Sequence, residues 1–226
     1  MRVAVLFSGG KDSTYALYKA GEAHEVVCLI TLISRNPESY MFHTPNINLA
    51  KLQAEAIGLP LLEKTTTGVK EEELTDLEDA ILEAKGKYRI EGVVTGAIAS
   101  VYQAERIRKL CDKLGLECIN PLWGIDQVKL LHELVESEFK VIISGVFAYP
   151  FDESWLGRVI DDAAIEELVK LKAEYKINPS GEGGEIETTV LDTPFFRRRV
   201  EIQEAETSFR NNAGVYMIKK AKLVGK

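Results

Sequence analysis

A strand–turn–helix unit near the start of the chain constrains its fold more than any other feature. Residues 3–7 form an apolar run typical of a buried strand, and residues 14–20 favour a helix. The string Ser8-Gly9-Gly10-Lys11-Asp12-Ser13 joins them. Such a turn gathers the unpaired N–H groups of the first helical turn and the positive end of the helix dipole at one point, which binds phosphate. We therefore predict a phosphate-binding loop formed by Ser8, Gly9, Gly10, Lys11, Asp12 and Ser13.

The spacing of this loop excludes two common phosphate-binding motifs. The P-loop needs a glycine and a following Ser or Thr at positions where this chain has Val5 and Asp12. The Gly-x-Gly-x-x-Gly spacing of dinucleotide-binding folds is also missing. The string instead resembles Ser-Gly-Gly-x-Asp-Ser, the signature of the PP-loop ATP pyrophosphatases. Those enzymes cleave ATP between the α- and β-phosphates and pass AMP to an acceptor.

Composition narrows the class of protein. A chain of 226 residues suits one large domain, or one domain with a smaller partner. Its net charge of −7 argues against broad nucleic-acid binding, since Arg197-Arg198-Arg199 is the one evident basic cluster. No apolar run is long enough to span a membrane and no signal peptide precedes the first strand, so we expect a cytoplasmic protein. A homodimer is compatible with this sequence.

The cysteines indicate no disulfide framework and no zinc site. Cys28, Cys111 and Cys118 are odd in number and show no C-x-x-C pairing. We expect reduced, mostly buried thiols, and a redox or sulfur-carrying role for Cys111 and Cys118 stays open.

Strands alternate with helices through the first two thirds of the chain. We predict strands at 3–7, 25–33, 61–64, 92–96 and 140–146, and helices at 46–57, 70–87, 102–114 and 127–137. Continuous apolar strands in this alternation are typical of an α/β fold, a parallel sheet with helices on both faces. Ligands of such sheets bind beyond the carboxyl ends of the strands. We therefore expect phosphates on the first loop, and adenine between Ser34 and the segment Gly96-Ala97-Ile98.

The pattern changes after about residue 150. A helix at 161–175 and strands near 189–191, 197–202 and 214–223 predict a smaller α+β domain. We accordingly expect an ATP-binding domain over residues 1–150 and a substrate-binding domain over residues 151–226. The second domain contains Gly181-Glu182-Gly183-Gly184-Glu185-Ile186-Glu187-Thr188, which is too rich in glycine and glutamate to be core. From composition alone, this string is equally a solvated hairpin or a substrate-binding loop.

A PP-loop followed by a Glu-Gly-Gly-Glu-x-Glu-Thr string resembles the diphthine–ammonia ligase family in its short archaeal form. Three further strings are similar to the same family: Ser39-Tyr40-Met41-Phe42-His43, Thr95-Gly96-Ala97-Ile98 with Tyr102-Gln103, and Asn120-Pro121-Leu122-Trp123. The resemblance covers nearly the whole chain and implies that eukaryotic members carry extra C-terminal domains. It also implies a HUP-like (adenine nucleotide alpha hydrolase-like) fold.

The resemblance implies the last step of diphthamide biosynthesis. Diphthine on translation elongation factor 2 would be amidated by ammonium through an acyl-adenylate, with release of AMP and pyrophosphate. Lys11, Asp12, Glu182, Glu185 and Glu187 would be catalytic, with Asp12 also a ligand of Mg²⁺ bound with ATP. The three glutamates would bind cationic groups, and one would deprotonate ammonium. Substrate contacts would come from His43, Tyr102, Gln103, Gly183, Gly184 and Thr188, although structural roles stay open for the first three.

Other functions would also use a PP-loop. A tRNA-modifying enzyme would need a basic RNA-binding face and, for thiolation, paired catalytic cysteines. A non-catalytic ATP-binding protein would bind ATP without releasing pyrophosphate. A pyrophosphatase acting on a small carboxylate, as in NAD or GMP synthesis, would carry other strings that this sequence lacks.

Overall fold

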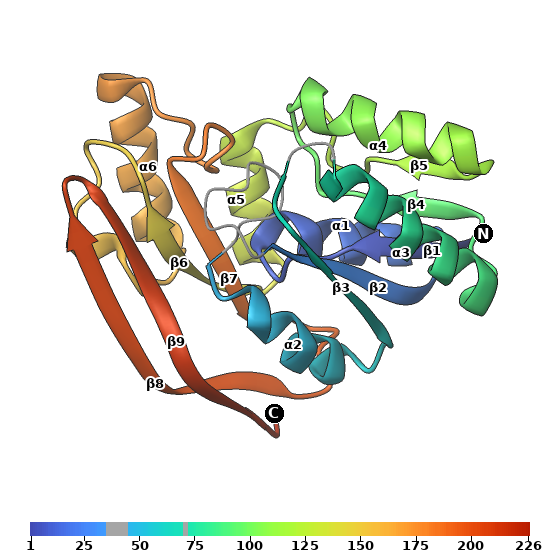
Figure 1. The fold of residues 1–226 in the computed structure, drawn as a ribbon. Helices are drawn as coiled ribbons and strands as arrows, with labels where there is room; N and C mark the ends of the chain where they lie inside the picture. The colour runs from blue at the N-terminus through green and yellow to red at the C-terminus, as the bar shows by residue number, and fades with distance from the viewer. Residues whose placement is uncertain (35–44, 70–71) are drawn as a thin grey trace. The chain divides into compact units, whose positions relative to one another are not determined.

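The chain folds into two units, each built around its own β-sheet. The computed structural model describes residues 1–34, 45–69 and 72–226. One unit spans Met1–Trp123 and the other Gly124–Lys226, and each contains one of the sheets (Figure 1). In the described residues, no helix is both long enough and apolar enough to cross a lipid bilayer.

The first unit is a parallel α/β sheet, which confirms the predicted fold class. Its strands β1 to β5 lie in the order β3-β2-β1-β4-β5, and every neighbouring pair is parallel. The strands are Arg2–Leu6, Glu25–Ser34, Leu61–Thr66, Gly92–Val94 and Glu117–Ile119. The helices are α1 Lys11–Gly21, α2 Ala50–Ile57 after the 3-10 turn η1 Ile47–Leu49, α3 Glu72–Tyr88 and α4 Val101–Leu114.

The topology of this sheet switches at β1. The chain builds outward from β1 through β2 to β3, and then returns to place β4 and β5 on the other side of β1. Val5 therefore pairs with Leu29 on one side and with Val94 on the other. The exits of β1 and β4 are neighbours at the switch point, where open α/β sheets bind their ligands.

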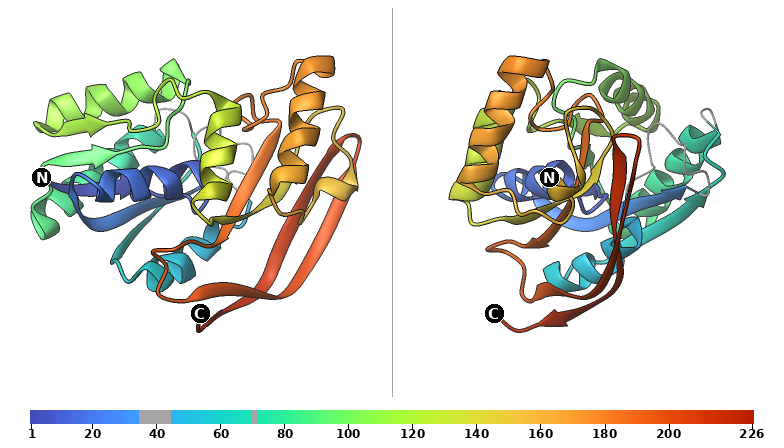
Figure 2. Two further views of the ribbon diagram at one scale, coloured as in Figure 1. Left: turned by 180° about the vertical axis from the view of Figure 1, so that it is seen from behind. Right: turned by 90° about the vertical axis from the view of Figure 1, so that its left-hand side faces the viewer.

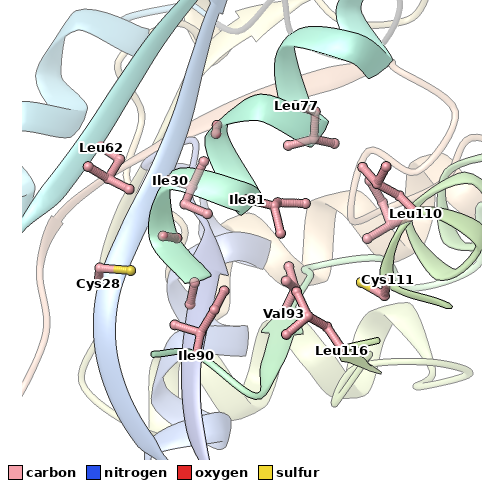
Figure 3. Close-up of a cluster of buried hydrophobic side chains, with 14 of the residues drawn as sticks. Cys28, Ile30, Leu62, Leu77, Ile81, Ile90, Val93, Leu110, Cys111 and Leu116 are labelled. Carbon is pink, nitrogen blue, oxygen red and sulfur yellow. The ribbon is translucent and has the colours of Figure 1, made fainter. Parts of the chain in front are cut away.

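A buried apolar cluster holds α3 and α4 against one face of the sheet. Cys28 and Ile30 of β2 and Val93 of β4 meet Leu77 and Ile81 of α3 within it. Leu110 and Cys111 extend the cluster to α4, and Figure 3 shows these side chains pointing toward one another. Side chains alternate across a strand, so Val3 and Val5 lie on the other face, and α1 contacts β1, β2 and β4.

The second unit is an antiparallel sheet with two helices. Strands β6 Lys140–Val146, β7 Ile186–Asp192, β8 Arg199–Arg210 and β9 Ala213–Val224 lie in the order β7-β6-β9-β8. Helices α5 Gln127–Glu136 and α6 Asp162–Tyr175 contact each other, and the 3-10 turn η2 spans Glu153–Trp155. Strands β8 and β9 run side by side along their whole length (Figure 2). The turn that joins them is Asn211-Asn212, with φ of 54° and 60°.

The boundary predicted at residue 150 is wrong. The division falls after Trp123, because β6 pairs antiparallel with β7 and β9 and not with the parallel sheet. β6 is buried over nearly its whole length, since it lies inside the second sheet. A continuous apolar run results in either kind of sheet, so the run at 140–146 did not reveal which sheet it joins.

Candidate active site

The predicted phosphate-binding loop lies between β1 and α1, at the carboxyl edge of the parallel sheet. Gly9 has a φ of +79°, a left-handed conformation that favours glycine. Gly10 is the N-cap of α1, and no side chain caps the helix there. The loop therefore lies at the amino end of α1, where the positive end of the helix dipole favours an anion.

Hydroxyl groups fix the shape of this loop. The Ser13 hydroxyl accepts from the Ser8 N–H at 3.2 Å and donates to the Gly10 carbonyl at 3.2 Å. The Ser8 and Ser13 hydroxyls lie 3.2 Å apart, and the Thr14 hydroxyl donates to the Gly10 carbonyl at 2.8 Å. Ser13 thus organises the loop, and its side chain is buried.

Lys11 and Asp12 place opposite charges at the start of α1. Lys11 Nζ lies 2.8 Å from Asp12 Oδ2, with the lysine side chain 3% exposed and the aspartate side chain 31% exposed. Asp12 Oδ1 is buried and accepts no hydrogen bond from any described residue. A buried carboxylate oxygen without a hydrogen-bond donor favours binding of a cation, which would compensate its negative charge.

The donor set at Asp12 fits Mg²⁺ bound together with phosphate. Mg²⁺ commonly takes one or two protein carboxylates and completes its shell with phosphate oxygens and water. Within the described ranges, no group of three or more His, Cys, Asp or Glu side chains could hold a metal ion without such help. A shared site with a polyphosphate is therefore the arrangement that these residues can support.

Gln53 of α2 holds the loop from outside, and sequence reasoning missed it. Its Nε2 donates to the Gly9 carbonyl at 2.9 Å, and the side chain is 1% exposed. A Cβ on Gly9 would lie 2.0 Å from Gln53 Oε1, so the loop has room only for glycine at that position. The available signal was a glutamine among the buried residues Ala50, Ala54 and Ile57 of the same helix.

The segment after β4 packs directly against the loop. A Cβ on Gly96 would lie 2.8 Å from both the Asp12 carbonyl carbon and the Ser13 backbone nitrogen. The structure therefore brings the predicted adenine segment Gly96-Ala97-Ile98 next to the start of α1. Thr95 fixes this segment, because its hydroxyl bonds Asn120 Oδ1 at 2.5 Å and accepts from the Ala97 N–H at 3.2 Å.

The other residues predicted in this unit lie around the same edge. Ser34 ends β2, half-buried, four residues beyond Ile30, the partner of Leu6. Tyr102 and Gln103 lie in the first turn of α4, where the Ser100 hydroxyl caps the helix by accepting from the Gln103 N–H. The Arg106 guanidinium lies 3.8 Å from the centre of the Tyr102 ring. His43, with the string 39–43, lies outside the described residues.

Two thiols of the first unit lie within hydrogen-bonding reach of each other. Cys111 of α4 and Cys118 of β5 share a hydrogen bond, which raises the pKa of Cys111 and lowers that of Cys118. The Asn120 amide also contacts Cys118 Sγ at 3.7 Å. Burial raises the pKa of Cys28, elsewhere in the sheet, to about 12. All three cysteines are free, as predicted.

The glycine- and glutamate-rich string forms an ordered loop in the second unit and not a plain hairpin. Gly181 and Gly184 both have a φ of +81°, and the Gly184 N–H donates to the Gly181 carbonyl at 2.8 Å. Ile186, Glu187 and Thr188 already belong to β7, where Glu187 pairs with Gly145 of β6. Glu182, Glu185 and Glu187 are half-buried, Gly183 and Gly184 are exposed, and Thr188 is buried.

The Glu185 carboxylate is occupied by its own loop. Oε1 accepts from the backbone N–H and side-chain amide of Asn178 at 2.9 and 2.8 Å, and Oε2 accepts from the Gly183 N–H at 2.8 Å. A Cβ on Gly183 would lie 2.7 Å from Asn178 Nδ2 and from both Glu185 oxygens, so a side chain there would displace these hydrogen-bonding groups.

Family models match both units. Residues 1–118 match the model described as the diphthamide synthase N-terminal domain, and residues 126–224 match the diphthamide synthase C-terminal domain. The gap between the two matches falls where the chain divides into its units.

Two curated relatives are named diphthine–ammonia ligase. The protein from Rattus norvegicus is 35% identical over 91% of this chain and 84% of its own length. That from Schizosaccharomyces pombe is 32% identical over 97% of this chain but only 39% of its own length. Long additional segments are thus not general to eukaryotic relatives, contrary to the expectation from the resemblance.

One solved structure shows a weak similarity. It is described as a predicted subunit of tRNA methyltransferase from Methanocaldococcus jannaschii, and it aligns with a TM-score of 0.42 and 21% identity over 86% of this chain and 98% of that one. A similarity of this degree carries no argument about function.

Proposed function

This chain belongs to the diphthamide synthase family, and from that membership we propose that it is a ligase that amidates diphthine on translation elongation factor 2. Ammonium supplies the amide nitrogen, and ATP is cleaved to AMP and pyrophosphate. The observation that carries the proposal is the family match over both units, combined with an ordered anion-binding loop at the switch point of the parallel sheet. Since this elongation factor works in the cytoplasm, we place the reaction there.

The reaction needs ATP because a carboxylate is a poor acyl donor. Ammonia cannot displace hydroxide from the diphthine carboxylate at a useful rate in water. Transfer of AMP to that carboxylate makes an acyl-adenylate, from which AMP leaves when ammonia attacks the carbonyl. Catalysis then consists mainly of placing the reactants and stabilising the charge that develops on pyrophosphate.

The first unit would hold ATP. Lys11 and the backbone N–H groups of Gly9, Gly10 and Ser13 would bind the phosphates, and Ser8 would maintain the loop with Ser13. Lys11 suits this role because its ammonium lies beside α1's first turn and is already fixed by Asp12. The adenine would lie between Ser34 and the segment Gly96-Ala97-Ile98, which touches the loop directly.

Asp12 would hold the magnesium ion that accompanies ATP. The ion, when bound, neutralises phosphate charge and favours departure of pyrophosphate. The buried Oδ1 of Asp12 would be available to such an ion, since it accepts no hydrogen bond from the described residues and Lys11 pairs with Oδ2.

The second unit would bind the acceptor side of the reaction. Glu182 and Glu187 would attract ammonium and the quaternary ammonium of diphthine, and one of them would take the proton that ammonium must lose. Gly183, Gly184 and Thr188 would shape that surface. Tyr102 and Gln103 at the start of α4, together with His43, would contact the substrate from the first unit.

Reconstitution tests this function. The protein is incubated with ATP, ammonium and diphthine-bearing elongation factor 2, and mass spectrometry of the modified histidine reports conversion of the carboxylate to the amide. Amide and AMP should form in equal amounts, and leaving out ammonium should stop amide formation. Recovery of tRNA in place of the elongation factor in a pull-down would favour a tRNA-modifying enzyme. ATP binding without release of pyrophosphate would indicate a non-catalytic protein.

A further inference from the structure

A series of hydrogen bonds between side-chain amide groups, the amide network, connects α5 to the Glu185 carboxylate. Gln127 Oε1 accepts from the Ser180 N–H at 3.1 Å and from the Ser180 hydroxyl at 2.8 Å. Gln127 Nε2 donates to Asn178 Oδ1 at 3.0 Å. Asn178 then donates from Nδ2 to Glu185 Oε1 at 2.8 Å, and Glu185 Oε2 accepts from Gly183.

The orientation of each side-chain amide in this network is fixed by the group next to it. A backbone N–H can only donate, so Ser180 requires the oxygen of Gln127 to face it. The Gln127 amide nitrogen must then face Asn178 Oδ1, and this directs the Asn178 nitrogen at Glu185. A carboxylate can only accept hydrogen bonds. Glu185 therefore ends this series of hydrogen bonds and leaves no donor unpaired within it.

Both ends of the amide network are anchored by further hydrogen bonds. Gln127 is the first residue of α5, and the Asp126 side chain caps that helix by accepting from Val128 and Lys129 at 2.9 and 3.0 Å. At the other end, the Glu185 carbonyl accepts from the Phe147 N–H at 2.9 Å, just where the loop enters β7. The loop is therefore fixed to two elements of its own unit through side-chain and backbone hydrogen bonds.

We propose that Gln127 and Asn178 are positioning residues that hold the 181–187 loop in its substrate-binding form through Glu185. Glu185 itself is a positioning residue in this arrangement, because both of its carboxylate oxygens accept hydrogen bonds from Asn178 and Gly183. The inference rests on the proposed function for its substrate, but the network and its effect on the loop do not. Such preorganisation favours binding because the loop loses little conformational freedom when the substrate arrives.

Isosteric variants separate positioning from packing. Gln127→Glu keeps the size of the side chain and both acceptor bonds from Ser180, but it sets a carboxylate oxygen against Asn178 Oδ1. Asn178 can avoid this repulsion between two oxygen atoms only by rotating its amide, which turns its own oxygen toward the Glu185 carboxylate. The repulsion is then moved to Glu185, in the loop. Gln127→Glu should therefore be at least as damaging as Gln127→Ala, whereas a packing role predicts the reverse. In Glu185→Gln, whichever way the amide turns, its NH₂ group faces another N–H donor.

Hydrogen exchange of the free protein is the first measurement. Amides of residues 181–187 should exchange at least tenfold faster in Gln127→Glu and Glu185→Gln, and at the wild-type rate in Gln203→Ala, a control with an exposed glutamine of β8. Melting temperatures identify any variant that has lost its fold. Wild-type exchange in both isosteric variants would overturn the proposal, whether or not the protein amidates diphthine.

Steady-state kinetics are the second measurement. The KM for the elongation factor should rise tenfold or more in Gln127→Glu, with ATP binding and the pH profile of kcat unchanged. A loss of kcat confined to Glu185→Gln, with an altered pH profile and normal Gln127 variants, would instead make Glu185 the base and overturn the proposal. Failure of wild-type protein to form the amide would reject the proposed function and leave the exchange result standing.

Discussion

Gly96→Ala should damage the nucleotide site without touching any polar group. The added methyl would lie 2.8 Å from the Asp12 carbonyl carbon and the Ser13 nitrogen, and 3.0 Å from the Asp12 carbonyl oxygen. All three are backbone atoms in the first turn of α1, so no side chain can rotate away. Either the segment after β4 or the start of α1 must move by several tenths of an ångström.

The size of the effect follows from these contacts. Overpacking of this kind costs about 1–3 kcal/mol. For a chain of 226 residues, that corresponds to a fall in melting temperature of roughly 2–12 °C. If the shift removes one charge-assisted hydrogen bond from the phosphates, the affinity for ATP falls by about tenfold to a hundredfold.

Calorimetry of ATP binding and thermal melting measure the two effects, with Gly86→Ala as the matched control. Gly86 lies within α3, and a Cβ there has no neighbour within 4 Å. That variant should gain about 0.5–1 kcal/mol of stability, since alanine favours helix over glycine, and should bind ATP normally. Wild-type melting and ATP affinity in Gly96→Ala would refute the close packing of the two segments.

Three further predictions concern charged groups and thiols. Lys11→Ala should lower amidation by about a hundredfold or more while the circular dichroism spectrum is retained, because it removes the cation beside the phosphates; wild-type turnover would contradict this role. Asp12→Asn should raise the magnesium concentration for half-maximal rate by about tenfold or more, and an unchanged titration would limit Asp12 to orienting the loop. Near pH 8, iodoacetamide should label Cys118 first, because its hydrogen bond with Cys111 lowers its pKa and the thiolate is the nucleophile. Burial raises the pKa of Cys28 to about 12, so Cys28 should stay thiol and unlabelled until the pH approaches that value, and equal labelling in peptide mass spectra would argue against both shifts.

The turn at residues 8–13 between β1 and α1 was predictable because its determinants are local. A buried strand, two glycines and a helix start lie within a few residues, and the hydrogen bonds of Ser8 and Ser13 stay inside that segment. Gln53 was not predictable in the same way, because its partner Gly9 lies on a distant part of the chain. Within its own helix, it is visible only as one polar residue on an apolar side.

Prediction of the sheets from the sequence was limited in a similar way. The run at 140–146 was correctly predicted as a strand, but its direction depends on the partners β7 and β9. Strand β5 was missed, since Glu117–Ile119 is three residues long and shows neither alternation nor a continuous apolar run. The role of Glu185 was also hidden, because a sequence gives the charge of a carboxylate but not the donors that occupy it.

The central place of β1 has a consequence for how the protein is made. The strand that precedes the phosphate-binding loop is synthesised early, yet its neighbour β4 must close a connection that runs from Val3 to Gly92 before the two can pair. Pairings between such distant residues form slowly, because the loop entropy is lost before the contacts are gained. The proposed nucleotide site would therefore form late in folding, and a nascent chain that ends before β4 would carry the complete Ser8-to-Ser13 string without that site.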